Sequence, residues 1–158
     1  MTMRMSWIKV SPGSYQAMKG LEDFIEQSKL EPRLKELVKI RASQINGCAY
    51  CLDMHTKDAR AIGESEPRIH LLPAWRETSF YTERERAALA WCESLTQLPQ
   101  TGAPDDVYAG LEKVFKPEEI VELTLVIVAI NSWNRLGVGF RSEAGKYVSH
   151  KSAQEVGT

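Results

Sequence analysis

Residues 36–55 have the sequence ELVKIRASQINGCAYCLDMH and predict two helices joined by a tight turn. The first helix begins near Pro32, because proline suits the first helical position, and its apolar residues recur at helical spacing. The dipeptide Asn46-Gly47 ends it, since glycine adopts the left-handed conformation that caps many helices. The second helix then begins around Cys48 and ends at Gly63. This stretch therefore predicts a helical hairpin.

The rest of the chain also favours helices and lacks the alternating pattern typical of strands. Thr82 and Glu85 form a capping-box pattern that opens a helix. Pro117 and two following glutamates form another start signal before the most apolar segment, 120–136, which we expect to be the central buried helix. We expect helices over 15–28, 32–45, 48–63, 82–95, 105–115 and 117–136, a short helix or irregular segment over 68–75, a loop over 99–104 and a frayed polar tail over 146–158.

The composition is that of one globular domain. The chain has 158 residues, 43% hydrophobic and 26% charged, so we expect a single all-helical domain over 1–158 with its core at about 12–143. A formal net charge of -1 offers no basic field to nucleic acid or anionic lipid. No apolar run approaches the ~20 residues that cross a bilayer, and residues 1–15 do not resemble a secretion signal. We therefore expect a cytoplasmic protein that binds neither nucleic acid nor membrane.

Residues with redox and proton-transfer chemistry share one face of the second helix. Cys48 and Cys51 are three residues apart and His55 follows Cys51 by four, so their side chains lie on adjacent turns. Two cysteines so placed can form a disulfide. Cys48 is expected in the first turn, where unpaired backbone N–H groups favour a thiolate, whereas His55 can accept the proton of Cys51. The spacing alone leaves open which thiol is the nucleophile.

Glu36 lies at a distance from the turn that is similar to that of His55. It precedes Gly47 by 11 residues, and His55 follows Gly47 by 8. At 1.5 Å per residue both lie roughly 12–17 Å from the turn if the helices fold back on each other. A contact between Glu36 and His55, direct or through water, would orient the imidazole and raise its basicity.

These residues resemble the core motif of the alkylhydroperoxidase D-like branch of the carboxymuconolactone decarboxylase superfamily. In that motif a glutamate precedes Cys-x-x-Cys by twelve residues and a histidine follows the second cysteine by four. Glu36, Cys48, Cys51 and His55 match these positions. The resemblance extends to residues 82–91 and 130–136 and covers about 12–143. It implies a compact all-α multi-helix bundle that assembles as a homo-oligomer, a trimer or a hexamer.

The resemblance also implies a cysteine-based peroxidase that requires no metal or organic cofactor. Cys51 would be the peroxidatic thiol, activated through Glu36 and His55, and Cys48 would resolve its sulfenic acid to a disulfide. An external dithiol partner would then reduce the pair, and we expect the hydroperoxide substrate to be small. Tyr50 departs from members that place a second histidine directly before the second cysteine. Tyrosine can donate a hydrogen bond to a peroxide oxygen but is a poor base near pH 7, so Tyr50 is a candidate supporting residue.

Other interpretations stay open for the cysteine pair. A structural zinc ion bound by Cys48, Cys51 and His55 would need a fourth ligand. That ligand would come from Cys92, His70 or His150. The pair also suits a thiol–disulfide reductase or a redox-sensing assembly module without peroxidase turnover. Lactone decarboxylation, the activity of the superfamily's other branch, uses no such pair.

Polar residues in the apolar segments need partners. Asn131, Trp133 and Asn134 fall in the expected buried helix, where they would cap neighbouring helices or line the pocket beside the thiols, and Asn134 is a candidate supporting residue. Arg41 lies on the apolar side of its helix and is expected to pair with an acidic residue. Cys92, among alanine, leucine and tryptophan, is expected to be a small buried residue.

Overall fold

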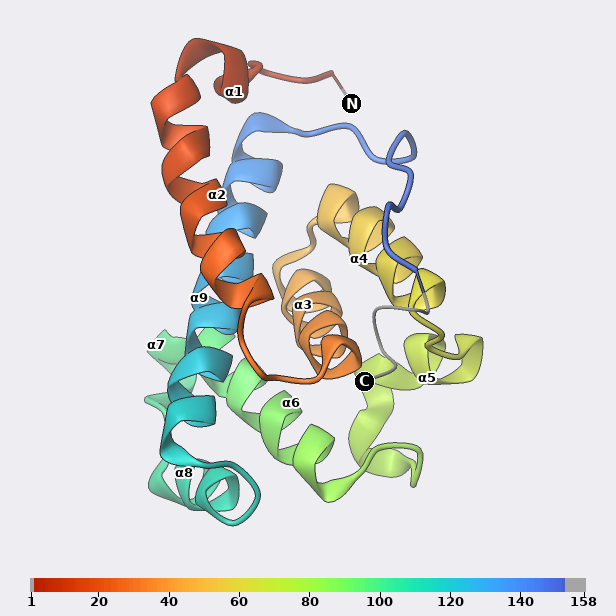
Figure 1. The fold of residues 1–158 in the computed structure, drawn as a ribbon, viewed down its shortest axis with the longest axis vertical. Helices are drawn as coiled ribbons and strands as arrows, with labels where there is room; N and C mark the ends of the chain where they lie inside the picture. The colour runs from red at the N-terminus through yellow and green to blue at the C-terminus, as the bar shows by residue number, and fades with distance from the viewer. Residues whose placement is uncertain (1, 153–158) are drawn as a thin grey trace.

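Helix α3 (Pro32–Asn46) lies at the centre of the molecule, and α4, α6 and α9 pack around it (Figure 1). The computed structural model describes residues 2–152, in which no strand occurs. The expected all-α multi-helix bundle is confirmed. The other helices are α1 (Trp7–Val10), α2 (Pro12–Glu26), α4 (Ala49–Ala61), α5 (Glu66–Leu71), the 3-10 helix η1 (Leu72–Glu77), α6 (Glu83–Thr96), α7 (Leu98–Thr101), α8 (Asp105–Glu112) and α9 (Pro117–Phe140).

The start and stop signals in the sequence place most helix ends. Gly47 caps α3 in the left-handed conformation, with φ of 65°. Thr82 and Glu85 form both hydrogen bonds of the capping box at the start of α6. Two expectations differ from the structure. Cys48 is the N-cap of α4 and not a residue of its first turn, and the expected loop at 99–104 holds most of the short helix α7.

Helix α9 is longer than the sequence predicts, ending at Phe140 and not at 136. It packs against α2, α3, α4, α6 and α8. Its length and apolar composition are sufficient to cross a membrane, although the central helix of a soluble protein has the same properties. The expectation of a central buried helix is therefore only partly met, because α3 takes the central position and α9 leaves Val121 and Val128 exposed by 61% and 47%.

The central position of α3 buries its charged residues as well as its apolar ones. One apolar cluster lies between α2, α3, α4, α6, α8 and α9, and a second lies between α3, α4, α5, η1 and α6. As a result Lys35, Glu36 and Lys39 are exposed by only 4%, 0% and 2%. Buried charges are costly unless they are paired, so these residues must find partners inside the molecule.

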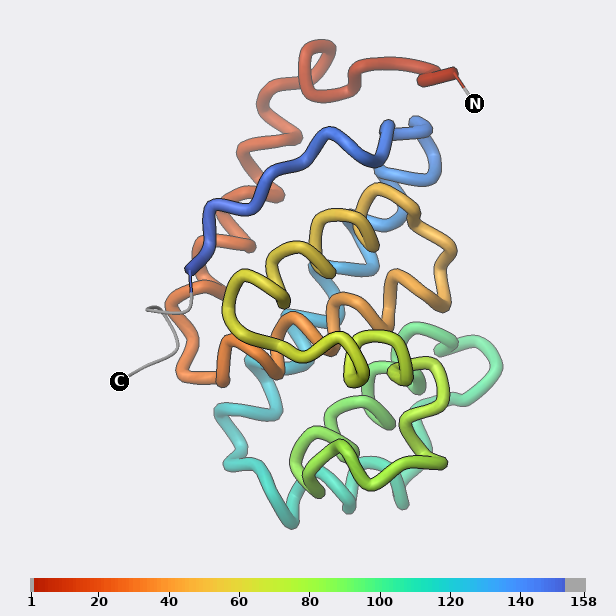
Figure 2. The backbone as a smooth tube through the Cα atoms, turned by 90° about the vertical axis from the view of Figure 1, so that its right-hand side faces the viewer, coloured from red at the N-terminus to blue at the C-terminus, as the bar shows by residue number. Residues whose placement is uncertain are grey.

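Residues 145–151 form an ordered segment, called here the C-terminal strap, that follows α4 (Figure 2). The amide of Gly145 donates to Asp53 Oδ2 at 2.9 Å, and Lys57 Nζ donates to the Tyr147 carbonyl at 2.9 Å. The expectation of a frayed tail from residue 146 is therefore wrong for 146–151, because charged side chains of α4 pair with the strap. Residues 153–158 of that expectation lie outside the described residues.

Candidate functional site

Cys48 and Cys51 form a disulfide at the start of α4, with their Cα atoms 5.4 Å apart. The left-handed turn at Gly47 ends α3 and places Cys48 at the N-cap of α4, so Cys51 follows in the first turn. The backbone N–H of Cys51 donates to Cys48 Sγ at 3.3 Å, a contact that favours negative charge on that sulfur. Each cysteine is only 1% exposed, so the pair lies inside the larger apolar cluster.

Gly137 of α9 lies directly over the two sulfurs. A Cβ atom at this position would lie 2.9 Å from Cys48 Sγ and 3.6 Å from Cys51 Sγ. Only glycine lets α9 approach the pair this closely. Sequence reasoning missed Gly137, although a glycine inside an apolar helix is a signal of close packing because it costs helix stability.

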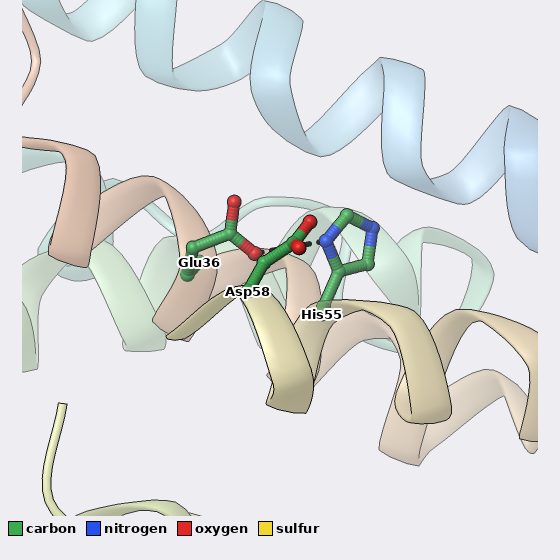
Figure 3. A group of neighbouring side chains, drawn as sticks. All are labelled: Glu36, His55 and Asp58. Carbon is green, nitrogen blue, oxygen red and sulfur yellow. Dashed lines mark hydrogen bonds and ion pairs between the residues drawn. The ribbon is translucent and has the colours of Figure 1, made fainter. Parts of the chain in front are cut away.

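His55 and Glu36 are in direct contact, as the distance argument from the sequence predicted. His55 Nδ1 lies 2.9 Å from Glu36 Oε2, and both residues are buried. Figure 3 shows the other ring nitrogen of His55 facing away from Glu36 and Asp58. An ionised Glu36 accepts the Nδ1 proton, so a neutral His55 carries its lone pair on Nε2. Cys51 and His55 both belong to the buried stripe of α4.

Glu36 is ionised although it is fully buried. Burial by itself would raise the pKa of this carboxyl group, but His55, Lys39 and Lys151 together hold the pKa well below its ordinary value. Lys151 of the strap donates to Glu36 Oε1 at 2.8 Å, so each carboxylate oxygen has a partner. Lys151 is not among the residues predicted from the sequence, because it belongs to the expected tail.

Asp58 lies beside Glu36 and His55 on the next turn of α4 (Figure 3). It accepts hydrogen bonds from the Tyr147 hydroxyl at 2.9 Å and from the Ser149 hydroxyl at 2.6 Å. Burial and the Asp58 carboxylate raise the pKa of Tyr147 above its ordinary value. Asp58 therefore fixes the middle of the strap next to the Glu36–His55 pair.

Glu36, His55 and Asp58 are spaced like the ligands of a cation, since one ligand atom of each lies within 4.8 Å of the others. Lys151 already neutralises Glu36, and Tyr147 and Ser149 donate to Asp58, so these oxygens are used in the structure. Among residues 2–152 this is the one such group of three, and it includes neither cysteine of the pair. Cys48 and Cys51 are bonded to each other in the structure, so their sulfurs are not arranged as ligands of the zinc ion considered as an alternative.

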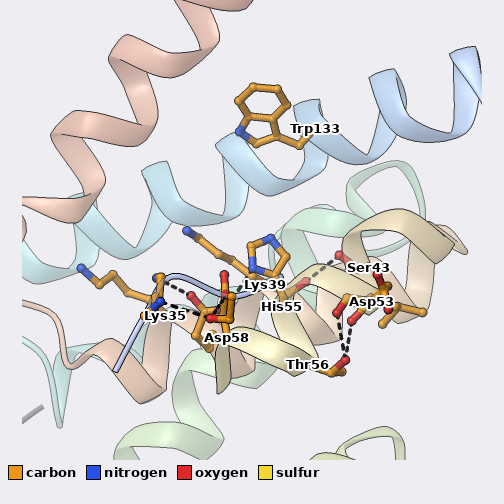
Figure 4. Close-up of polar contacts among 12 residues, drawn as sticks. Lys35, Lys39, Ser43, Asp53, His55, Thr56, Asp58 and Trp133 are labelled. Carbon is orange, nitrogen blue, oxygen red and sulfur yellow. Dashed lines mark hydrogen bonds and ion pairs between the residues drawn. The ribbon is translucent and has the colours of Figure 1, made fainter. Parts of the chain in front are cut away.

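A second ion pair adjoins the first, and Figure 4 shows Lys39 and Trp133, which both bind its carboxylate. Lys39 pairs with Glu22 of α2, and the Trp133 indole of α9 donates to the same carboxylate at 3.2 Å. The predicted need of Trp133 for a partner is thus met by Glu22. Lys39 also lies close enough to Glu36 to lower its pKa.

Asn134 fastens the end of α3 to α9. Its side chain accepts from Asn46 Nδ2 at 2.9 Å and donates to Ser43 Oγ at 3.0 Å, and Asn46 also donates to Asn131 at 3.0 Å. The buried asparagines thus have hydrogen-bond partners, but those on α3 are side chains and not the unpaired backbone groups that the expected helix caps would bind. Tyr50 is half-buried and packs at the edge of the larger apolar cluster.

The remaining candidate residues lie apart from this site. Cys92 is fully buried, as expected, and its thiol donates to the Val38 carbonyl at 3.4 Å. Burial raises the pKa of Cys92 to about 12, so it remains a thiol at neutral pH. His70 is exposed and lies 3.5 Å from Glu66, and Arg41 pairs with Glu93 at 2.8 Å as predicted.

Residues 12–94, just over half of the chain, match the Carboxymuconolactone decarboxylase family. The chain belongs to this family. The matched region contains Glu36, both cysteines of the pair and His55. A family relative from Bacillus subtilis (strain 168), the uncharacterized protein YdfG, is 42% identical over 144 residues, which are 91% of this chain and 98% of that protein.

Solved structures share the fold of this family member. A protein of unknown function from Agrobacterium tumefaciens, for which a role in antioxidant defence as an AhpD protein has been suggested, is 47% identical with a TM-score of 0.90. The match covers 92% of this chain and 100% of that chain. The debrominase Bmp8 is 21% identical with a TM-score of 0.79, covering 88% of this chain and 75% of its own, and shows the fold alone. The expected AhpD-like fold is confirmed.

Proposed function

We propose that this family member is a thiol-dependent peroxidase that reduces small hydroperoxides. The observation that supports the proposal most directly is the buried Glu36–His55 contact at 2.9 Å, one helical turn from Cys51. A histidine oriented by a carboxylate is the usual means of activating a neighbouring thiol. The antioxidant role suggested for the Agrobacterium relative is consistent with this activity.

In the first step the Cys51 thiolate attacks the distal oxygen of the hydroperoxide. His55 accepts the thiol proton at Nε2 and passes a proton to the departing alkoxide. The O–O bond breaks, an S–O bond forms, and the products are a sulfenic acid on Cys51 and an alcohol. Glu36 holds the imidazole and balances its charge while it carries the second proton.

In the second step the Cys48 thiol attacks the sulfenic sulfur, which forms the Cys48–Cys51 disulfide and releases water. An external dithiol then returns both cysteines to thiols by exchange and becomes a disulfide itself. We propose Cys51 as the first nucleophile because His55 follows it by one turn. The N-cap position of Cys48 supports the opposite order, and serine variants separate the two.

The experiment is stopped-flow oxidation of the reduced protein by tert-butyl hydroperoxide, with dithiothreitol as the dithiol for turnover. We expect fast disulfide formation that is lost in Cys51→Ser and stops at the sulfenic acid in Cys48→Ser. His55→Ala should slow the reaction by roughly 100-fold or more, the usual contribution of a general base. His70→Ala, which removes an exposed histidine elsewhere, is the matched control and should react like the unmodified protein.

Two other outcomes would contradict the proposal in different ways. If all variants react at the slow rate of an ordinary thiol, peroxide is not the substrate, and the pair is a site of disulfide exchange. If the protein oxidises quickly but dithiothreitol gives no further turnover, it is a redox sensor and not a peroxidase.

For the cellular context we propose the cytoplasm, whose reducing poise would return the disulfide to thiols. We also propose a homo-oligomer, a trimer or a hexamer. Val121 and Val128, one heptad apart on α9, are 61% and 47% exposed and offer an apolar surface for assembly. Light scattering of the purified protein gives the mass that decides the oligomeric state.

A further inference from the structure

The C-terminal strap runs along α4 in the same direction as the helix, and its contacts advance with it (Figure 2). Gly145 binds Asp53, Tyr147 binds Lys57 and Asp58, and Lys151 at the far end binds Glu36. A segment without secondary structure is thus held at regular intervals by charged side chains. This path brings the ammonium group of Lys151 to the buried Glu36 carboxylate of the candidate site.

Lys151 and His55 each bind one oxygen of the Glu36 carboxylate. Lys151 Nζ lies 2.8 Å from Oε1 and His55 Nδ1 lies 2.9 Å from Oε2, while the Glu36 side chain is 1% exposed. Water therefore has little access to either oxygen, and these two groups replace it. The Lys151 side chain is 24% exposed and also contacts Glu26 at 3.4 Å, so it reaches the carboxylate from the surface.

Other charged or titratable groups face the pair from α2, α3, α4 and the strap, and Lys35, Lys39 and Asp58 are labelled in Figure 4. Helix α9 adds the uncharged indole of Trp133, which donates a hydrogen bond to Glu22. The charged and titratable groups are Glu22 and Glu26 of α2, Lys35 and Lys39 of α3, Asp58 of α4, and Tyr147 and Lys151 of the strap. Lys35 and Lys39 each have a glutamate of α2 as their nearest acidic partner. Lys151 is therefore the cation that binds Glu36 itself.

We propose, building on the peroxidase site above, that Lys151 is a positioning residue of the proton relay, which the strap brings to Glu36 from the C-terminal end of the chain. Lys151 fixes one carboxylate oxygen, so that the other is aligned with His55 Nδ1. It also offsets the negative charge that His55 would otherwise balance alone. With the carboxylate held in this way, the His55 ring keeps the orientation in which Nε2 serves as a base for Cys51.

Loss of the Lys151 charge should raise the pH at which the reactive thiolate forms. Removal of the Lys151 charge takes one positive charge from the cluster beside the cysteine pair, which disfavours the negatively charged thiolate. This effect moves the formation of the reactive thiolate to higher pH. A role limited to holding the fold together would lower thermal stability without moving this pH dependence.

The test compares Lys151→Met with Lys151→Arg and with the matched control Lys146→Met. Lys146 belongs to the same strap, but its side chain is 82% exposed and pairs with Glu143 on the surface. All proteins carry His150→Gln, because His150 is an exposed imidazole beside Tyr147 that would complicate a pH profile. The first readout is the pH dependence of single-turnover oxidation by tert-butyl hydroperoxide.

We expect the acid limb of the profile to move up by about half a pH unit or more in Lys151→Met, as expected for loss of a nearby opposite charge. Lys151→Arg should restore most of the original profile, and Lys146→Met should leave it unchanged. If Lys151→Met lowers the melting temperature but keeps the profile of the parent protein, the positioning role is overturned.

A second readout separates this inference from the peroxidase proposal. In a Cys48→Ser background, the rate of Cys51 alkylation by iodoacetamide reports thiolate formation without any peroxide. Cys92 does not interfere, because its pKa is raised to about 12. A shift of the alkylation profile in Lys151→Met supports the role of Lys151 even if hydroperoxide proves not to be the substrate. An unchanged alkylation profile contradicts it even if the peroxidase activity is found.

Discussion

Gly137 controls how closely α9 approaches the cysteine sulfurs. We predict that Gly137→Ala lowers the free energy of unfolding by about 1–3 kcal/mol, because its Cβ would overlap Cys48 Sγ. Formation of the disulfide should also slow, since the sulfurs must move away from α9. Urea denaturation and the rate of disulfide formation measure the two effects.

The matched control for this variant is Gly139→Ala, two residues further along α9. A Cβ atom at Gly139 would meet nothing within 4 Å, so alanine should gain about 0.5–1 kcal/mol of helix stability. Equal effects of the two substitutions would show that the contact of Gly137 with the sulfurs has no energetic consequence.

A second prediction at the scale of residues concerns how Glu36 affects the pH dependence of the protein's stability. Its folded-state pKa lies below the ordinary value of 4.5. The carboxylate therefore contributes stability that is fully present above about pH 4.5 and is lost as the pH falls from there. The difference in unfolding free energy between the unmodified protein and Glu36→Gln should shrink between pH 6 and pH 3.

Urea denaturation at each pH measures this difference. Glu22 and Glu93 also have lowered pKa values, so both proteins should lose stability in acid, and only their difference reports Glu36. Asp23→Asn, which removes an exposed carboxylate of α2, is the control. A difference that stays constant down to pH 3 would mean that Glu36 has no charged partner of consequence.

At the residue scale the sequence could identify the groups within the helical hairpin. The lengths of two helices around Gly47 were sufficient to bring Glu36 to His55. Gly137 and Lys151 could not be found this way, because both reach the site from segments remote in sequence. Their positions depend on how α9 and the strap pack, which no local spacing expresses.

At the scale of elements, the asparagines join α3 to α9. We predict that Asn134→Ala costs about 1–3 kcal/mol of unfolding free energy, because Ser43 and Asn46 lose a buried hydrogen-bond partner. Ser132→Ala on the same helix removes only a hydroxyl bonded to the Val128 carbonyl, and should cost little. Thermal unfolding of both variants measures the contrast, and equal costs would exclude a specific role for Asn134.

The sequence predicts a helix end correctly where one capping residue determines it, as at Gly47 and Thr82. It predicts the end less well where contacts with other helices determine it. Helix α9 continues past 136 through two glycines that disfavour a helix locally, because Gly137 is packed over the sulfurs. Tertiary contacts thus override propensity at the end of α9 that belongs to the candidate site.

At the scale of the whole molecule, the strap closes the chain against α4. We predict that Tyr147→Phe weakens it by about 1 kcal/mol, since the hydroxyl no longer donates to Asp58. The strap would then open about fivefold more often, and limited tryptic cleavage after Lys146 should quicken by a similar factor. Tyr108→Phe, an exposed tyrosine of α8, is the control and should leave the cleavage rate unchanged.

The strap has a consequence for how such a protein can evolve. Lys151 lies outside residues 12–94, the part of the chain that matches the family. Segments without secondary structure accept sequence change more readily than core helices do. Substitutions in the strap would therefore retune the reactivity of the cysteine pair in one step, while every helix that builds the fold stays intact.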